Sequence, residues 1–301
     1  MKSNVWNINN IPDQKDKIVI VTGSSSGIGY EAAKALADKN AVVIIAVRNE
    51  ERGKRAVQRV KETNADAKVE LMLIDLADQQ SIQKFTREFR KKYDQLDLLI
   101  NNAGVMIPPY SKTKDGFELQ FGTNHLGHFT LTGLLMDIIL KTKHSRIVNV
   151  SSSAHRYGNI NFEDLNWEKR KYRKWVAYGD SKIANLYFTY ELKRKFEENR
   201  ISTIVTAAHP GVVMTELQRH SKLIKFFTPL VAMKSKQGAL STLRAAVDED
   251  VRSGDYFGPD GFQQLRGFPV KVRSNRLSQD KAIAKKLWKV SEKLTGIIYQ
   301  F

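Results

Sequence analysis

The chain has 301 residues, of which 42% are hydrophobic and 9% aromatic, a composition typical of a globular protein rather than a disordered one. It contains no cysteine, which excludes disulfides, thiolate metal sites and cysteine nucleophiles. The formal net charge of +17 is spread along the sequence without an aromatic-basic RNA-binding motif. We therefore do not expect nucleic acid as the primary partner, and attraction to an anionic small molecule explains the charge better.

The beginning of the chain suggests a cellular location. Residues 1–17, MKSNVWNINNIPDQKDK, lack the apolar middle of a signal peptide, and no stretch approaches the roughly 20 apolar residues of a spanning helix. These features predict a cytoplasmic protein.

Short apolar runs alternate with helical patterns along most of the chain. The predicted strands occupy residues 17–23, 41–48, 69–76, 96–104, 146–152 and 202–211. The predicted helices occupy residues 30–40, 49–64, 78–94, 123–140 and 181–199. Strands that are apolar throughout indicate a buried parallel sheet, so we expect a doubly wound α/β fold with helices on both faces and a single domain, 1–301.

The last helical pattern, residues 278–296, places Ile283, Leu287, Val290 and Leu294 on one face, between Ser278 as the first cap and Gly296 as the stop. Its basic outer face permits peripheral membrane contact, but docking onto the domain is the stronger expectation.

The sequence TGSSSGIG joins the first predicted strand to the first helix. Its glycines permit positive φ and close approach of backbone to a phosphate, and the helix N-terminus favours a pyrophosphate. Between a strand and a helix of an α/β chain, this turn predicts a dinucleotide site. The predicted contacts are Gly23, Ser25, Ser26, Gly27, Ile28 and Gly29.

The end of the second strand selects between the two dinucleotides. An acidic residue there would bind the 2′-hydroxyl of NAD, whereas an arginine accommodates the 2′-phosphate of NADP. The sequence reads AVRNEER, so Arg48, with Arg52 as a second cation, favours NADP(H), with NAD(H) still possible. Asp75 and Leu76 end the third strand where the adenine is expected, although Asp75 could equally be a helix cap.

Three tyrosine–lysine pairs share one spacing: Tyr30–Lys34, Tyr110–Lys114 and Tyr178–Lys182. The other motifs, and their order along the chain, indicate which of the three pairs is catalytic. TGSSSGIG, NNAG (101–104), TNHLGHF (123–129), VSSS (150–153), YGDSK (178–182) and HPGVVMT (209–215) together resemble the short-chain dehydrogenase/reductase family over residues 15–215. The stretch between VSSS and YGDSK resembles the branch that contains retinol dehydrogenases and WW-domain oxidoreductases.

The resemblance implies roles for the catalytic residues. Tyr178 would be the acid/base, and Lys182, one helical turn on, would lower the pKa of the phenol by its charge. Ser152 would hold the substrate oxygen, with Ser151 and Ser153 as neighbouring alternatives. Asn124 would support a water chain from Lys182. The implied cofactor contacts are Asn102, Ala103, Gly104, Tyr178, Lys182, Pro210, Gly211, Val213 and Thr215.

The expected reaction is carbonyl reduction or alcohol oxidation with NADP(H) on a small-molecule substrate. Residues 15–215 would form the cofactor-binding and catalytic core, and residues 216–301 the substrate lid and C-terminal helix. An apolar wall suits a lipophilic carbonyl, or else its side chains pack the domain's own core or a partner subunit. Its members would be Met106, Phe226, Phe227, Leu230 and Met233.

Alternative functions are an NAD-linked alcohol dehydrogenase and a non-catalytic nucleotide-sensing scaffold. The membrane-anchoring first helix of animal retinol dehydrogenases has no counterpart in the given sequence, which leaves a retinoid substrate open. A homo-oligomer through the helices around Asn124 and after Tyr178 is possible. Among the histidines, His155 could line the substrate mouth or lie on the surface, and His209 is expected to be structural. His125 and His128 lack a third ligand, so no metal is expected.

Overall fold

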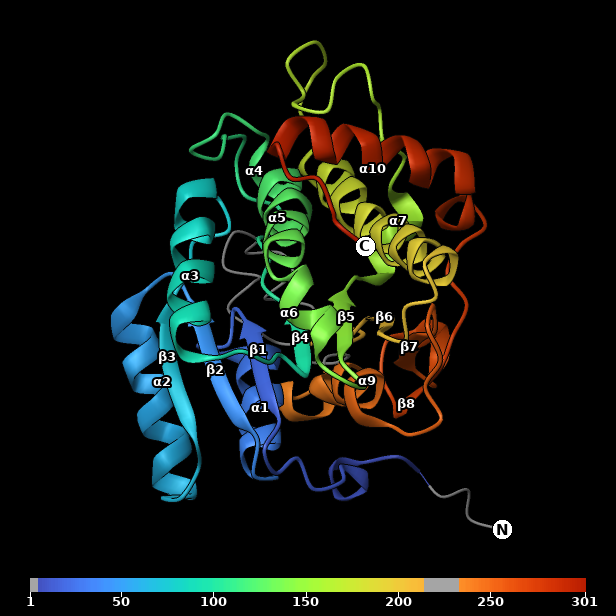
Figure 1. Ribbon diagram of the computed structural model, residues 1–301. Coiled ribbons are helices and arrows are strands. Elements are labelled where there is room, and N and C mark those ends of the chain that lie inside the picture. The colour runs from blue at the N-terminus through green and yellow to red at the C-terminus, as the bar shows by residue number, and fades with distance from the viewer. Residues whose placement is uncertain (1–4, 214–232) are drawn as a thin grey trace.

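The computed structural model describes residues 5–213 and 233–301. Their centre is an eight-stranded sheet in the order β3-β2-β1-β4-β5-β6-β7-β8, parallel except for the last pair, β7 and β8. The predicted doubly wound α/β fold is thereby confirmed (Figure 1). The strands are β1 (Ile18–Thr22), β2 (Val42–Val47), β3 (Val69–Leu73), β4 (Leu98–Asn101), β5 (Arg146–Val150), β6 (Ile204–Ala208), β7 (Tyr256–Pro259) and β8 (Pro269–Lys271).

Alternate residues of the strands pack into two hydrophobic cores, one on each face of the sheet. Val19 and Val21 face a core closed by α1 (Gly27–Ala37), α2 (Glu50–Thr63) and α9 (Ser235–Val247). Ile18 and Ile20 face the other core, which is closed by α3 (Gln79–Lys92), α5 (Gly127–Leu134), α6 (Met136–Lys141) and α7 (Lys174–Glu198). The helices therefore form two layers around the sheet, and α10 (Lys281–Thr295) lies over α7 (Figure 1).

The helix predicted over residues 123–140 is interrupted. A short α4 (Leu119–Phe121) leads into a π-helix (Gly122–Leu126), then α5, and Leu135 with φ −102° and ψ 1° separates α5 from α6. A π-turn holds one residue more than an α-turn, and such turns often occur at functional sites. The π-helix is followed by Gly127, which lies beside Leu76, just after the end of β3. A Cβ on Gly127 would lie 2.4 Å from the Leu76 carbonyl oxygen.

Other boundaries also differ from the prediction. α7 begins at Lys174, seven residues earlier than expected, and so carries both Tyr178 and Lys182. α9, β7 and β8 had no predicted counterpart. Short 3-10 helices span Ile8–Asn10, Ser153–Tyr157, Phe262–Gln264 and Leu277–Gln279.

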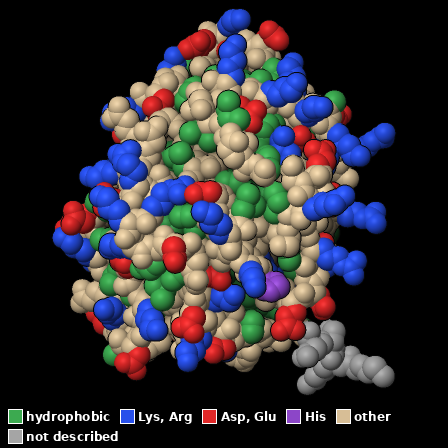
Figure 2. Space-filling model, in the orientation of Figure 1, with side chains coloured by type: hydrophobic (Ala, Val, Ile, Leu, Met, Phe, Trp, Pro, Cys, Tyr) green, Lys and Arg blue, Asp and Glu red, His purple; other side chains and the backbone are tan. Residues whose placement is uncertain are grey.

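The C-terminal helix begins after Asp280, whose side chain accepts from Ala282 N and Ile283 N, rather than at Ser278. It ends at Gly296 as predicted, and it docks on the domain by burying Leu287 and Trp288. Beyond it, the buried Tyr299 hydroxyl donates to the Phe129 carbonyl oxygen at 2.6 Å. Over residues 5–213 and 233–301, no helix is both long and apolar enough to cross a membrane. Lysine and arginine side chains are scattered among acidic ones on the face shown in Figure 2.

Candidate active site

A cavity of about 440 Å³ opens at the carboxyl ends of the strands, where the sheet order reverses between β1 and β4. In open α/β sheets this reversal point is where ligands bind. Most of the predicted site residues line the cavity: Gly23, Ser25, Ser26, Gly27, Ile28, Gly29, Arg48, Asp75, Leu76, Asn102, Ala103, Gly104, Tyr178, Lys182 and Pro210. Arg52, Val150 and Ser151 also line it.

The glycine loop is shaped by contact with the turn after β4. Gly23 has φ +67° and Gly27 φ +61°, values that disfavour any residue with a Cβ. A Cβ on Gly23 would lie 2.8 Å from Ala103 Cα, and a Cβ on Gly29 would lie 2.3 Å from Asn102 Nδ2. The loop therefore needs glycine at these positions, and the N-terminus of α1 is left open to an anion.

Two exposed arginines stand at the end of the cavity beside β2. Arg48 follows the strand directly, and Asn49 caps α2 by accepting from Arg52 N at 2.9 Å. Asp75 lines the cavity and accepts from Ala77 N at 3.0 Å. The cap of α3 is Asp78, so the alternative that Asp75 caps that helix is wrong.

Tyr178 and Lys182 lie at the other end of the cavity, on one face of α7. Both side chains are buried, and Lys182 Nζ is 5.7 Å from the centre of the Tyr178 ring and donates to Val150 O at 3.2 Å. Burial raises the pKa of Tyr178 to about 12, against a hydrogen bond with the Ser152 side chain that lowers it. Burial lowers the pKa of Lys182 to about 8. Burial therefore dominates the pKa of the phenol, and the lowering expected from Lys182 stays a prediction.

The two other tyrosine–lysine pairs lie outside the cavity. Tyr30 is buried in the α1 core with the Arg59 guanidinium 4.0 Å from its ring centre, and Tyr110 is exposed and donates to Asn166 O.

The serines after β5 have different partners. Ser151 is buried and its hydroxyl donates to Lys182 O at 2.8 Å, so it is engaged in holding α7. Ser152 is half-buried, caps the following 3-10 helix, and its side chain lowers the pKa of Tyr178. Ser151 lines the cavity and Ser152 does not, so the choice of Ser152 over Ser151 stays a prediction.

Asn124 lies behind the cavity, fully buried within the π-helix. Its Oδ1 accepts from Val105 N at 2.8 Å, and its Nδ2 donates to Val105 O at 3.0 Å and to Ser181 Oγ at 2.9 Å. A Cβ on Gly104 would lie 3.0 Å from Asn124 Oδ1 and 3.6 Å from Lys182 Nζ. Asn124 therefore joins the turn after β4 to the helix that carries the tyrosine and lysine.

Some predicted residues lie elsewhere. Gly211 and Val213 follow β6 but do not line the cavity; Gly211 has φ +73°, and Val213 bridges to Met233. Met106 packs beside Tyr178. Met233 is buried, and its sulfur accepts a hydrogen bond from Gly267 N, so Met233 packs in the core of the domain, as the alternative for the apolar wall predicted. Thr215, Phe226, Phe227 and Leu230 lie outside the described residues.

His155 and His209 are buried and hydrogen-bonded. His155 contacts Ser152 O and Asn275 N, so the prediction that it lies on the surface is wrong, and its place at the substrate mouth stays a prediction. His209 bonds Gln264 and Gly211 N, which fits the structural role expected of it.

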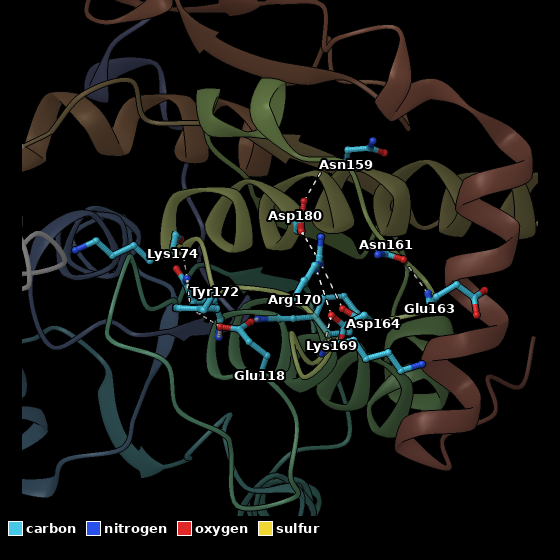
Figure 3. Close-up of polar contacts among 12 residues, drawn as sticks. Glu118, Asn159, Asn161, Glu163, Asp164, Lys169, Arg170, Tyr172, Lys174 and Asp180 are labelled. Atoms are coloured by element: carbon cyan, nitrogen blue, oxygen red, sulfur yellow. Dashed lines mark hydrogen bonds and ion pairs between the residues drawn. The ribbon is translucent and has the colours of Figure 1, made fainter.

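A buried charged cluster beneath α7 was missed by sequence reasoning. We call Glu118, Asp164, Arg170 and Asp180 the acidic cluster (Figure 3). The Arg170 guanidinium lies 3.4 Å from Asp164 and 3.9 Å from Asp180, and packs 3.5 Å from the Trp167 ring centre. Burial raises the pKa of Asp180 to about 7, and burial also raises that of Glu118. The only sequence signal was the mixture of charges and aromatics in residues 162–173, which reads equally well as a solvated loop.

The acidic cluster fastens residues 158–173 to α7. Asp180 Oδ1 accepts from Asn159 N at 2.8 Å, and Glu118 accepts from the Tyr172 hydroxyl at 2.8 Å. Asp180 lies between Tyr178 and Lys182 in sequence, so the cluster supports the turn of α7 that faces the cavity.

Comparison with known proteins adds independent findings. The short chain dehydrogenase family model matches residues 17–223. Mouse retinol dehydrogenase 12 is 41% identical over 290 residues, covering 94% of this chain and 88% of its own, and human retinol dehydrogenase 11 is 40% identical over 286 residues, covering 93% and 86%. The crystal structure of a protein from Mycobacterium Paratuberculosis superposes with a TM-score of 0.84 at 37% identity, covering 99% of this chain and 100% of that one.

These relatives correct the predicted location. The cytoplasmic placement is contradicted by the similarity to retinol dehydrogenases, the group whose animal members were noted above for a membrane-anchoring helix. The absence of a signal peptide in residues 1–17 does not distinguish a cytoplasmic enzyme from such proteins. The predicted enzyme class is confirmed, an oxidoreductase acting on CH–OH donors with NAD(P). By the family match and these identities, the chain belongs to the short-chain dehydrogenase family.

Proposed function

We propose that this chain is an NADP(H)-dependent oxidoreductase that interconverts a lipophilic aldehyde or ketone and its alcohol. The observation that carries the proposal is one cavity with the glycine loop and two arginines at one end and Tyr178 and Lys182 at the other. Carbonyl reduction requires a hydride donor, a proton donor and a group that stabilises the developing oxyanion. The side chains at the end of the cavity that holds Tyr178 and Lys182 fit the roles of proton donor and of oxyanion-stabilising group.

The residues at the first end fit a dinucleotide. The glycine loop leaves no room for side chains at Gly23 and Gly29, and the N-terminus of α1 suits a pyrophosphate. Arg48 and Arg52 supply the positive charge that a 2′-phosphate requires. When bound, the nicotinamide exchanges a hydride with the carbonyl carbon.

Proton transfer falls to Tyr178. A phenol whose pKa is raised to about 12 is protonated at neutral pH, so Tyr178 carries the proton that carbonyl reduction requires. Lys182 offers a nearby cation against which the phenolate is stabilised, and Ser152 offers a hydroxyl to hold the substrate oxygen. Met106 and Ile107, which pack against Tyr178, support an apolar substrate.

Cofactor choice is tested by titrating NADPH and NADH into wild type and Arg48→Ala. Loss of a charged contact to the 2′-phosphate should weaken NADPH binding by about 1–3 kcal/mol and leave NADH binding nearly unchanged. Arg55→Ala is the matched control, because Arg55 is exposed on α2, the helix that follows Arg48, and does not line the cavity. Equal affinity of both cofactors for both proteins would reject NADP specificity.

The catalytic assignment is tested with Tyr178→Phe in an assay of lipophilic aldehyde reduction. Removing the proton donor should lower kcat by about 10²–10⁴-fold while NADPH still binds. Tyr110→Phe, in a pair of the same spacing outside the cavity, should retain activity. Full activity in Tyr178→Phe would refute the assignment.

A further inference from the structure

His128 bridges two parts of the site that the sequence separates. Its Nε2 lies 2.9 Å from Thr22 Oγ1 at the end of β1, and its Nδ1 lies 3.0 Å from the Asn124 carbonyl oxygen in the π-helix. The side chain is fully buried, and burial is the main cause that lowers its pKa to about 4. The imidazole is therefore neutral at physiological pH, with one nitrogen protonated.

The partners determine which nitrogen carries the proton. A carbonyl oxygen only accepts, so Nδ1 must donate to Asn124 O. Nε2 must then accept, and the Thr22 hydroxyl donates to it. The same hydroxyl oxygen accepts from Asn102 N and Ala103 N, each at 2.9 Å. The Ile100 carbonyl oxygen, 3.4 Å from Thr22 Oγ1, is a more distant acceptor for the same hydroxyl, so His128 Nε2 at 2.9 Å is the closer one.

The series continues into the catalytic helix. Asn124 Nδ2 donates to Ser181 Oγ at 2.9 Å, and the Ser181 hydroxyl donates to the Tyr178 carbonyl oxygen at 2.8 Å. We call Thr22, His128, Asn124 and Ser181 the hydrogen-bond relay. It runs from the turn that packs on the glycine loop to the backbone of Tyr178, with every bond pointing the same way.

We propose that His128, as its Nδ1–H tautomer, is a positioning residue that sets Asn124 and the Tyr178 turn relative to the cofactor-binding turn. This inference rests on the proposed function. A rigid ring with a donor on one side and an acceptor on the other spans the two segments directly, and small displacements of catalytic groups lower turnover strongly.

His125 provides a matched control on the same helical turn. It is also fully buried, its pKa is lowered to about 3 by burial, and its Nε2 lies 2.8 Å from Ser291 Oγ on α10. It therefore ties the π-helix to the outer layer and takes no part in the relay.

The kinetic experiment compares His128→Phe, His128→Asn and His125→Phe at equal concentrations of folded protein. His128→Phe should lower kcat at least tenfold and change the NADPH Kd less than threefold. His128→Asn, whose Nδ2 can replace Nδ1–H as the donor to Asn124 O, should recover most of kcat, and His125→Phe should retain it. Unchanged kcat in His128→Phe, or an equal loss in His125→Phe, would overturn the proposal.

A second measurement does not depend on activity or on a folded variant. In wild type with ¹⁵N-labelled histidine, NMR should show His128 as the neutral Nδ1–H tautomer at pH 7. The Nε2–H tautomer, or an imidazolium, would overturn the relay. If wild type binds NADPH but reduces no carbonyl, the proposed function fails while the tautomer still decides the hydrogen-bond arrangement.

Discussion

Two buried polar networks hold α7 through the neighbouring residues Ser181 and Asp180, and they differ in charge. The hydrogen-bond relay on the cofactor side is neutral, and each donor in it meets an acceptor. The acidic cluster, which joins residues 158–173 to α7, contains three carboxyl groups and one guanidinium. A neutral, fully paired network fixes geometry without burying a net charge, whereas buried charges cost desolvation. The same helix is thus supported by two networks whose stability responds to pH in opposite directions, because folding lowers the pKa of His128 and raises that of Asp180.

The largest expected difference comes from removing the cation of the acidic cluster. Arg170→Met leaves Asp164 and Asp180 buried without their partner, which should cost about 2–4 kcal/mol at pH 8. Urea unfolding measures the loss. Lys112→Met removes an exposed ion pair with Glu168 at the edge of the same segment and should leave the unfolding midpoint unchanged. Similar small effects in both variants would mean that the buried charges contribute little.

Thr22 tests the neutral network. Thr22→Val deletes the hydroxyl that serves Asn102 N, Ala103 N and His128, leaving buried groups unpaired, and should cost about 1–3 kcal/mol. Thr22→Ser keeps the hydroxyl and should cost less. Because no charge is involved, the loss should be the same at pH 7 and pH 8. A loss that changes between these two pH values would contradict the neutral assignment.

The smallest expected effect is a difference in pH dependence. The pKa of Asp180 is raised from 3.8 to about 7 on folding, so its contribution to stability is present below pH 4 and is lost as pH rises through 7. The pKa of His128 is lowered from 6.5 to about 4, so its contribution is present above pH 6.5 and is lost as pH falls toward 4. The two networks therefore oppose each other between pH 5 and 6.5.

Unfolding free energies of Asp180→Asn and His128→Phe separate these contributions. Between pH 5 and 6.5, stability should rise with pH more steeply in Asp180→Asn than in wild type and less steeply in His128→Phe, by on the order of 1 kcal/mol in each case. Parallel curves for all three proteins would show that neither group titrates differently on folding.

The sequence allowed prediction of what local motifs specify. The glycine loop, Arg48, Tyr178 and Lys182 were identified because each occurs at a fixed place after a strand or within a helix, and all of them line one cavity. The six predicted strands followed from apolar runs. β7 was missed because YFGP is short and contains glycine and proline, which disfavour strands.

Contacts between distant residues could not be predicted in this way. His128 was considered only as a metal ligand, since its partner Thr22 lies 106 residues away in sequence. Hydrophobic periodicity does not distinguish a π-turn from an α-turn, so the interruption at residues 122–126 was missed as well. Asp180 has an ordinary sequence context, and its burial depends on how residues 158–173 pack over α7.

The bond from Tyr299 to Phe129 spans 170 residues and closes the outer side of α5, the helix that carries His128. During synthesis, the ribosome must release almost the entire described chain before this contact forms. Until then the aromatic side chains that surround Phe129 lack their cover from Trp288 and Tyr299. Between the synthesis of α7 and that of Tyr299, the nascent chain therefore exposes an apolar surface on α5, and a chaperone that binds such surfaces would protect it during that interval.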